Sequence, residues 1–209
     1  MPKLYVLHTG LLDWQTSIFH PVFSMSAFDD IRLTTSRLTL RPLLDEDASA
    51  LFAIYSDPRI MQFWSSPAWT SIVSAEEKIN RNRAGMAAGT SIGFGIFRSE
   101  DNQLLGTCDL FHLDQQCRRG EVGYGLAFEA WGQGYMQETM QVLLAYGFKD
   151  LALNRIEADI DPGNLASAKV LTRMGFALEG LLRERWIVGG IKSDSAMYGL
   201  LASEWQARV

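Results

Sequence analysis

Apolar and polar residues alternate in several short runs of this chain, which is the pattern of half-buried β-strands. Three of the runs follow one another with only polar turns between them, so their spacing predicts an antiparallel meander. The last two runs face each other across Gly189 and Gly190, which predicts a hairpin. In chain order the expected strands cover residues 36–42, 91–98, 104–113, 120–128, 155–161, 180–188 and 193–201.

Elsewhere apolar residues recur every three or four positions, as they do along the buried face of an amphipathic helix. The clearest case is 132–150, where Met136, Met140 and Leu143 fall on one stripe. Gly175 ends another such stretch in the manner of a helix C-cap. The remaining helices are expected at residues 45–57, 75–88 and 164–174.

The chain has 209 residues, of which 47% are hydrophobic, and this is enough to bury the core of one large domain. Residues 1–34 have no clean period, so we expect them to be an N-terminal extension of unknown role, with the domain at 35–209. Within the extension, Met25 is expected to be the natural start of the protein.

Charge and cysteine content exclude several classes of function. There are 19 Lys and Arg against 24 Asp and Glu, and the net charge of −5 disfavours broad capture of nucleic acid or of an anionic membrane. No apolar stretch reaches the length of a transmembrane helix. Cys108 and Cys117 are too few for a disulfide framework and lack zinc-site spacing, so no metal is expected and the compartment is expected to be the cytoplasm.

Five glycines stand close together just before the longest predicted helix: Gly120, Gly123, Gly125, Gly132 and Gly134. Glycines at a helix N-terminus let an anion approach exposed main-chain amides, which is how several phosphate sites are built. The third glycine of a dinucleotide-binding motif is missing, and the chain has no P-loop. A tight connection without a ligand is the alternative explanation.

The segment Phe128-Glu129-Ala130-Trp131-Gly132-Gln133-Gly134-Tyr135-Met136-Gln137-Glu138 resembles the acetyl-CoA pyrophosphate loop of the GNAT N-acetyltransferase superfamily. The similarity is greatest to the ribosomal-protein-alanine acetyltransferase-like branch. Further matches, in the order of that branch, are Arg37-Leu38-Thr39-Leu40-Arg41-Pro42, Asp57-Pro58, Glu121-Val122-Gly123-Tyr124, Asn164-Leu165-Ala166-Ser167 with Met174-Gly175-Phe176, and Glu179-Gly180. The resemblance implies an α+β fold whose mixed, mostly antiparallel sheet of about six to seven strands carries helices on both faces.

The resemblance also implies that acetyl-CoA is the co-substrate. Its pyrophosphate would face the main-chain amides of Gly132, Gln133, Gly134, Tyr135 and Met136, and its pantetheine would lie along Leu126, Ala127 and Phe128 and contact Asn164 and Ser167. Trp131 and Met136 depart from the general loop pattern. Because Met136 is bulkier than the usual Gly or Ala, we expect the helix start to lie slightly further from the phosphate.

Acetyl transfer by direct attack in a ternary complex needs an unprotonated amine. An α-amine has a pKa near 8 and a lysine amine one near 10.4, so a weak base favours a protein N-terminus or a small-molecule amine as acceptor. Glu121 is the candidate proton acceptor, with a solvated surface Glu as the alternative. Ser167 is the candidate that assists the departing thiolate, with simple helix capping as the alternative. Trp186 stands where the branch has a catalytic Glu, and Glu184, two residues earlier on the same strand face, is expected to replace it.

Aromatic residues in the loops beside the sheet are the candidate acceptor-binding residues: Phe63, Trp64, Trp69 and Trp186. Core packing or the contact surface of a homodimer are the alternatives. Asp109, Glu121 and Glu184 would attract a cationic amine.

Two other functions compete with this one. The departures at Met136 and Trp186 are compatible with a CoA-binding sensor that lacks transferase activity. Gly89-Thr90-Ser91-Ile92-Gly93 matches the nucleophile elbow of serine hydrolases. That elbow needs a strand before the serine and a helix after it, whereas the reverse order is expected around Ser91.

Overall fold

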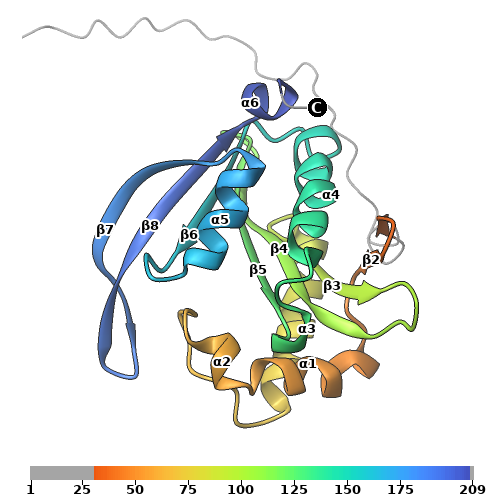
Figure 1. The fold of residues 1–209 in the computed structure, drawn as a ribbon. Helices are drawn as coiled ribbons and strands as arrows, with labels where there is room; N and C mark the ends of the chain where they lie inside the picture. Colours follow the sequence, from red (N-terminus) through yellow and green to blue (C-terminus); the bar gives the residue numbers. More distant parts are fainter. Residues whose placement is uncertain (1–30, 208–209) are drawn as a thin grey trace, which may run out of the picture.

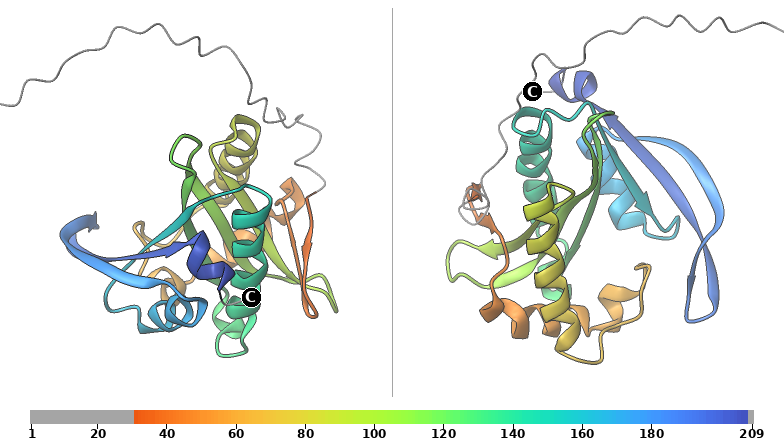
Figure 2. Two further views of the ribbon diagram at one scale, coloured as in Figure 1. Left: turned by 90° about the horizontal axis from the view of Figure 1, so that it is seen from above. Right: turned by 180° about the vertical axis from the view of Figure 1, so that it is seen from behind.

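The computed structural model describes residues 31–207, which form one open sheet with helices on both of its faces (Figures 1 and 2). The sheet has eight strands, one or two more than expected, in the order β1-β2-β3-β4-β5-β6-β8-β7. Every neighbouring pair is antiparallel except β5 and β6. The mixed, mostly antiparallel fold class is therefore confirmed. The strands are β1 (Leu33–Thr34), β2 (Leu38–Arg41), β3 (Ile92–Arg98), β4 (Leu104–Asp114), β5 (Arg119–Leu126), β6 (Arg155–Ile160), β7 (Ala177–Val188) and β8 (Ile191–Leu201).

The helices divide into two groups, each with its own apolar cluster. One cluster joins the sheet to α4 and α5, and the other lies among α1, α2 and α3. Figure 2 shows α3 and α4 on opposite sides of the sheet. The helices are α1 (Ala48–Tyr55), α2 (Pro58–Met61), α3 (Val73–Ala88), α4 (Tyr135–Lys149), α5 (Leu165–Met174) and α6 (Ala202–Gln206), and short 3-10 turns stand at Asp45–Asp47 and Phe128–Ala130.

The meander and the C-terminal hairpin expected from alternation are both present as β3-β4-β5 and β7-β8. Three short elements, β1, α2 and α6, were not expected because a few residues carry no measurable period. β1 lies inside the stretch assigned to the N-terminal extension. Residues 1–30 of that extension, including Met25, lie outside the described residues.

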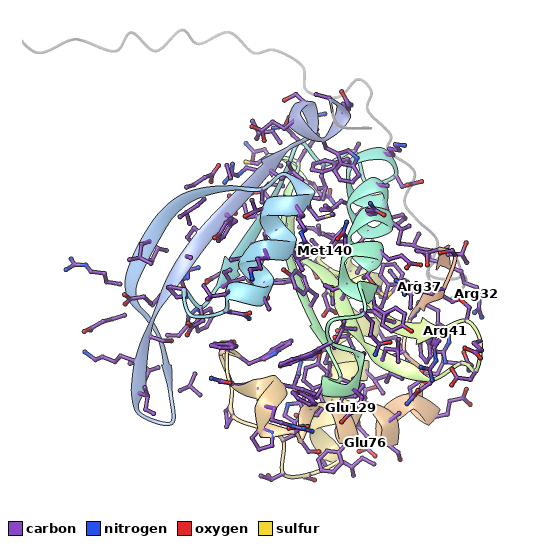
Figure 3. The ribbon with its side chains drawn as sticks, in the orientation of Figure 1. Arg32, Arg37, Arg41, Glu76, Glu129 and Met140 are labelled. Carbon is purple, nitrogen blue, oxygen red and sulfur yellow. The ribbon has the colours of Figure 1, made fainter. Side chains whose placement is uncertain are left out.

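The long helix α4 packs its predicted apolar stripe directly onto the sheet. Met140, labelled in Figure 3, is fully buried together with Leu143 and Leu144. Gly147 on the same face allows the closest approach, because a Cβ there would stand 2.9 Å from Cδ1 of Ile156. The burial of this stripe fixes the orientation of α4 and of the loop that precedes it.

The parallel strands β5 and β6 pair only over three residues, and the pairing stops at Glu121 and Glu157. Beyond that point the two strands diverge and open the sheet, as the lower half of Figure 1 shows. The N-terminal ends of α4 and α5 both point toward this lower side. The divergence is the feature of the fold that creates a site.

Glu179, in the matching segment Glu179-Gly180, contacts Arg155 at the start of β6. Its carboxylate accepts a hydrogen bond from Nη1 of Arg155 at 2.9 Å, and this contact lowers the pKa of Glu179. Arg155 also donates from Nε to Glu157 at 2.7 Å. These bonds tie β7 to β6 across the strand between them.

Within residues 31–207, no helix is both long and apolar enough to cross a bilayer. In the same range, His, Cys, Asp and Glu side chains form no group that could hold a metal ion.

Candidate functional site

A cleft of about 650 Å³ lies where β5 and β6 diverge. Its walls come from the segment after α2, from α3, from β4, β5 and β6, from the start of α5 and from the β7-β8 hairpin. Of the residues predicted for the site, six line it: Phe63, Trp64, Glu121, Asn164, Ser167 and Trp186. Segments far apart in the sequence therefore meet at one place.

The predicted cofactor loop runs between β5 and α4, at the N-terminal end of that helix. Gly132 and Gly134 have φ angles of +74° and +80°, in the left-handed region that favours glycine. In the part of the chain that the structure describes, the amides of residues 132–136 donate to no protein acceptor. A run of unpartnered amides at the positive end of a helix dipole is suited to bind an anion.

Met136, the bulky departure from the superfamily pattern, does not obstruct these amides. Its side chain is only 8% exposed and belongs to the core beneath α4. Tyr135 is buried beside it, with the Arg37 guanidinium 4.5 Å from its ring centroid. Both side chains point away from the loop surface, so the greater size of Met136 is accommodated in the core.

Arg37, which begins the matching segment Arg37-Leu38-Thr39-Leu40-Arg41-Pro42, holds the loop in place. It donates from Nε to Glu138 at 2.8 Å and from Nη1 to the carbonyl of Gln133 at 3.1 Å. Thr35 also donates to Glu138. Burial alone would raise the pKa of Glu138, but the hydrogen bonds from Thr35 and Arg37 outweigh it and lower that pKa. Figure 3 shows Arg37 beside α4.

The Asp57-Pro58 segment supports the loop from the opposite side. Asp57 caps α2 and pairs with Arg59, and this hydrogen bonding lowers the pKa of Asp57. The Arg59 guanidinium lies 3.9 Å from the centroid of the Phe128 ring and 3.5 Å from Glu129. The chain near two of the matching segments, at Arg37 and at Arg59 after Asp57-Pro58, thus contacts the loop.

Trp131 and Gln133 close the loop onto itself. The indole Nε1 of Trp131 donates to the Leu126 carbonyl at 2.9 Å, and Gln133 donates to the Glu129 carbonyl at 2.6 Å. Trp131 at the first loop position therefore has a local structural role.

The start of α5 brings Asn164 and Ser167 to the cleft. Asn164 caps the helix, since its Oδ1 accepts from the Ser167 amide at 3.0 Å. Helix capping, offered above as the alternative role of Ser167, thus falls to Asn164. Tyr124 from β5 also lines the cleft and donates from its hydroxyl to the Ser167 carbonyl at 3.4 Å. Burial raises the pKa of Tyr124, which keeps it a neutral O–H donor.

Glu121 has a partner that the sequence reasoning missed. His112 from β4 lies with its Nδ1 3.0 Å from Oε1 of Glu121, and both residues line the cleft. A bulge in β4 between Phe111 and Asp114 places His112 there, with a φ angle of +50°. Strict alternation assigns His112 to the other face, so no sequence pattern could have found this pair.

Glu184 does not reach the cleft. β7 bulges between Leu182 and Trp186, and Glu184 within the bulge has a φ angle of +51°. Its side chain is 63% exposed and accepts a hydrogen bond from Lys192 at 2.6 Å. The expectation that Glu184 shares a face with Trp186 is wrong because the bulge interrupts the alternation of side chains.

The four candidate aromatics have different positions. Trp69 stacks on Tyr55, with ring centroids 4.8 Å apart, and is not part of the cleft wall. Trp186 faces the cleft and donates from Nε1 to Asp159 at 3.3 Å. Asp159 also accepts from Arg185 at 2.7 Å.

The cleft is acidic. Five carboxylates line it against two permanent cations, Lys78 and Arg185. Asp109, expected to attract an amine, is paired with Lys78 at 3.1 Å. The carboxylates are Asp109, Glu121, Asp159, Asp161 and Asp194.

Ser91 also lines the cleft, but its surroundings are not those of a nucleophile elbow. It follows α3 and precedes β3, so a helix comes before it and a strand after it. His112, the one histidine among residues 31–207, is bonded to Glu121. The hydrolase interpretation is therefore not supported.

Comparison with known proteins gives a consistent result. Residues 37–177 match the family model described as an acetyltransferase (GNAT) domain. The chain is 37% identical over 173 residues to the uncharacterized N-acetyltransferase p20 of Bacillus licheniformis, covering 83% of this chain and 97% of that protein.

Two solved structures are similar in fold. A putative ribosomal-protein-serine acetyltransferase from Vibrio cholerae superposes with a TM-score of 0.73 at 26% identity, covering 83% of this chain and 98% of the other. Mycobacterium smegmatis RimJ, in complex with CoA-disulfide, superposes with a TM-score of 0.74 at 25% identity, covering 80% and 83%.

Proposed function

Because the chain belongs to the GNAT family of N-acetyltransferases, we propose that it moves the acetyl group of acetyl-CoA directly to a primary amine in a ternary complex. The acceptor is an α-amine at a protein N-terminus or a small-molecule amine. The observation that carries the proposal is the run of amides at residues 132–136 without an acceptor among the described residues, in a domain whose cleft is acidic.

The loop can hold a pyrophosphate without basic side chains. Charge-assisted hydrogen bonds contribute about 1.5–3 kcal/mol each. Three or four of them approach the roughly 8 kcal/mol that corresponds to micromolar affinity. Apolar contact of the pantetheine with the cleft would help to offset the entropic cost of binding.

Direct attack is favoured over an acetyl-cysteine intermediate by the positions of the two cysteines. Cys108 is fully buried, and burial raises the pKa of its thiol well above the usual range. Cys117 lies in the exposed turn between β4 and β5, away from the cleft wall. A thiolate nucleophile at the cleft therefore has no candidate among these residues.

The acidic lining favours a cationic acceptor. Lys78 and Arg185 each pair with one carboxylate, which leaves Glu121, Asp161 and Asp194 as further acids in the cleft. An amine that is partly neutral near pH 7 needs only a weak base, and this condition favours α-amines over lysine side chains.

The chemical step has a simple balance. The neutral amine nitrogen attacks the thioester carbon, a C–N bond forms and the C–S bond breaks, and the amine loses one proton as the CoA thiolate gains one. Ser167 is the proposed hydrogen-bond donor to the departing thiolate and keeps its own proton, while the thiolate takes a proton from solvent. Tyr124, whose hydroxyl bonds the Ser167 carbonyl, is the other hydroxyl at this place.

The test is release of free CoA thiol when the protein is incubated with acetyl-CoA and a panel of amines, together with calorimetric binding of CoA. Release with at least one amine supports the proposal. CoA binding without release of free CoA thiol for any amine would favour a CoA-binding sensor, which uses the loop but does not catalyse acetyl transfer. Absence of CoA binding would overturn both.

A further inference from the structure

We infer that His112 takes the proton from the acceptor amine and that Glu121 positions it, an assignment that rests on the function proposed above. This replaces Glu121 as the direct proton acceptor. Three observations carry the inference: a hydrogen bond, a backbone distortion, and a shared position in the cleft.

The hydrogen bond fixes the orientation of the imidazole. Nδ1 of His112 and Oε1 of Glu121 are 3.0 Å apart, and the carboxylate can only accept. In the tautomer in which Nδ1 carries the proton, His112 donates to Glu121 and its Nε2 keeps a free lone pair. The Glu121 side chain is 18% exposed, whereas that of His112 is 71% exposed, so the imidazole is the member open to a substrate.

The backbone distortion places the imidazole on this face. Phe111 pairs with Glu121 and Asp114 pairs with Arg119, so β4 has one more residue than β5 between these pairs. Without the bulge, His112 would point to the face opposite Phe111 and Glu121. Bulges near active sites commonly redirect a side chain in this way. His112 has a φ angle of +50°, a left-handed conformation that a non-glycine residue adopts at a cost in energy, and among the residues described with such a φ angle it alone lines the cleft.

The position in the cleft gives the pair access to the acceptor. His112 and Glu121 line the cleft with Trp186 and Phe63 from the expected acceptor side and with Ser167 from the thiolate side. In the step above, the proton of the attacking amine passes to Nε2 of His112 as the C–N bond forms. The imidazolium is stabilised by the adjacent carboxylate and returns the proton to solvent after product leaves.

Other charged groups share this space with His112 and Glu121. They are Lys78 from α3, Asp109 from β4, Asp159 and Asp161 from β6 and the residue after it, Arg185 from β7 and Asp194 from β8. The pH dependence of the wild type must therefore be compared with that of variants.

The experiment uses His112→Gly, because glycine accepts the positive φ angle while the imidazole is removed. We expect kcat/KM for the acceptor to fall about 100-fold, within the range of general base catalysis. Added imidazole should restore part of kcat, and the Kd for CoA should not change. Arg118→Gly is the matched control, since Arg118 in the same hairpin has a φ angle of +48° and does not line the cleft. This control should leave kcat/KM unchanged.

The pH profile separates the roles. In a plot of kcat/KM against pH, the fall at low pH that is caused by the enzyme should occur at the same pH for acceptors whose amines differ in pKa. This fall should be absent in His112→Gly. Glu121→Gln should lower kcat with little change in KM, because glutamine keeps an oxygen that can accept from Nδ1 but removes the negative charge beside the imidazolium.

Full activity of His112→Gly, or a loss that imidazole does not rescue, would overturn the inference while leaving the transferase proposal intact. A wild type that binds CoA and acetylates no amine would overturn both.

Discussion

The cofactor loop takes its binding groups from the main chain of one continuous segment, residues 132–136, whereas the acceptor side of the cleft takes side chains from several strands and loops. The loop depends on two glycines in the left-handed region and on supports from Arg37 and Arg59. The acceptor side depends on bulges and on strand divergence. Substitutions should therefore affect CoA affinity and acceptor turnover separately.

The largest expected effect is on the loop. Gly134→Val places a β-branched residue at φ of +80°, which costs about 1–3 kcal/mol of backbone strain. We expect the Kd for CoA, measured by calorimetry, to rise about tenfold to hundredfold. Gly190→Val is the matched control, because Gly190 has a φ angle of +82° in the β7-β8 turn, outside the loop, with nothing within 4 Å of a Cβ. Equal weakening of CoA binding by the control would contradict a specific role for the loop.

The thiolate donor is the next test, because it lies between the two regions. Ser167→Ala should lower kcat about tenfold, the equivalent of one hydrogen bond, with CoA binding retained. Tyr124→Phe removes the neighbouring hydroxyl and should have a smaller effect on kcat. Steady-state kinetics of both variants decide the assignment, and a larger loss in Tyr124→Phe would transfer the role to Tyr124.

The hydrogen bonds that Glu138 accepts from Thr35 and Arg37 should make the stability of the protein depend on pH. Because the pKa of Glu138 is lowered in the folded protein, its contribution is present above the unfolded value near 4.3 and is lost as pH falls through the folded pKa. Glu138→Gln should reduce the free energy of unfolding by about 1.5 kcal/mol at pH 7. Denaturation of both proteins at a series of pH values should show the difference shrinking below pH ~4. Asp101→Asn, in the exposed pair with Arg98, is the control and should have a smaller effect. A constant difference across pH would contradict the role of the Glu138 charge.

The smallest effect is expected for the acceptor-side aromatics. Trp186→Leu should raise the KM of a cationic acceptor about threefold, as loss of a solvent-exposed cation–π contact does, and leave the Kd for CoA unchanged. Trp69→Leu should instead lower the melting temperature without changing that KM, because Trp69 stacks on Tyr55 away from the cleft. If Trp69→Leu raised KM as much as Trp186→Leu, the assignment of Trp69 to the core would fail.

The two regions also differ in how far the sequence predicts them. The long helices and the meander followed from periodicity, because their buried faces are regular over many residues. The loop was predictable because a left-handed backbone at a helix start leaves a visible glycine requirement. His112 was missed and Glu184 was misplaced for one shared reason. Each lies in a bulge, with one extra residue in β4 and two in β7, that interrupts the regular pairing from which side chains are assigned to faces, and nothing in the local composition marks it.

Two-dimensional NMR of the isotope-labelled protein during titration with CoA shows directly whether residues 132–136 hold the pyrophosphate. We expect the amide resonances of residues 132–136 to shift strongly on binding, while those of Gly189 and Gly190 do not move. CoA binding that leaves the resonances of 132–136 unchanged would contradict the assignment of this loop as the pyrophosphate site.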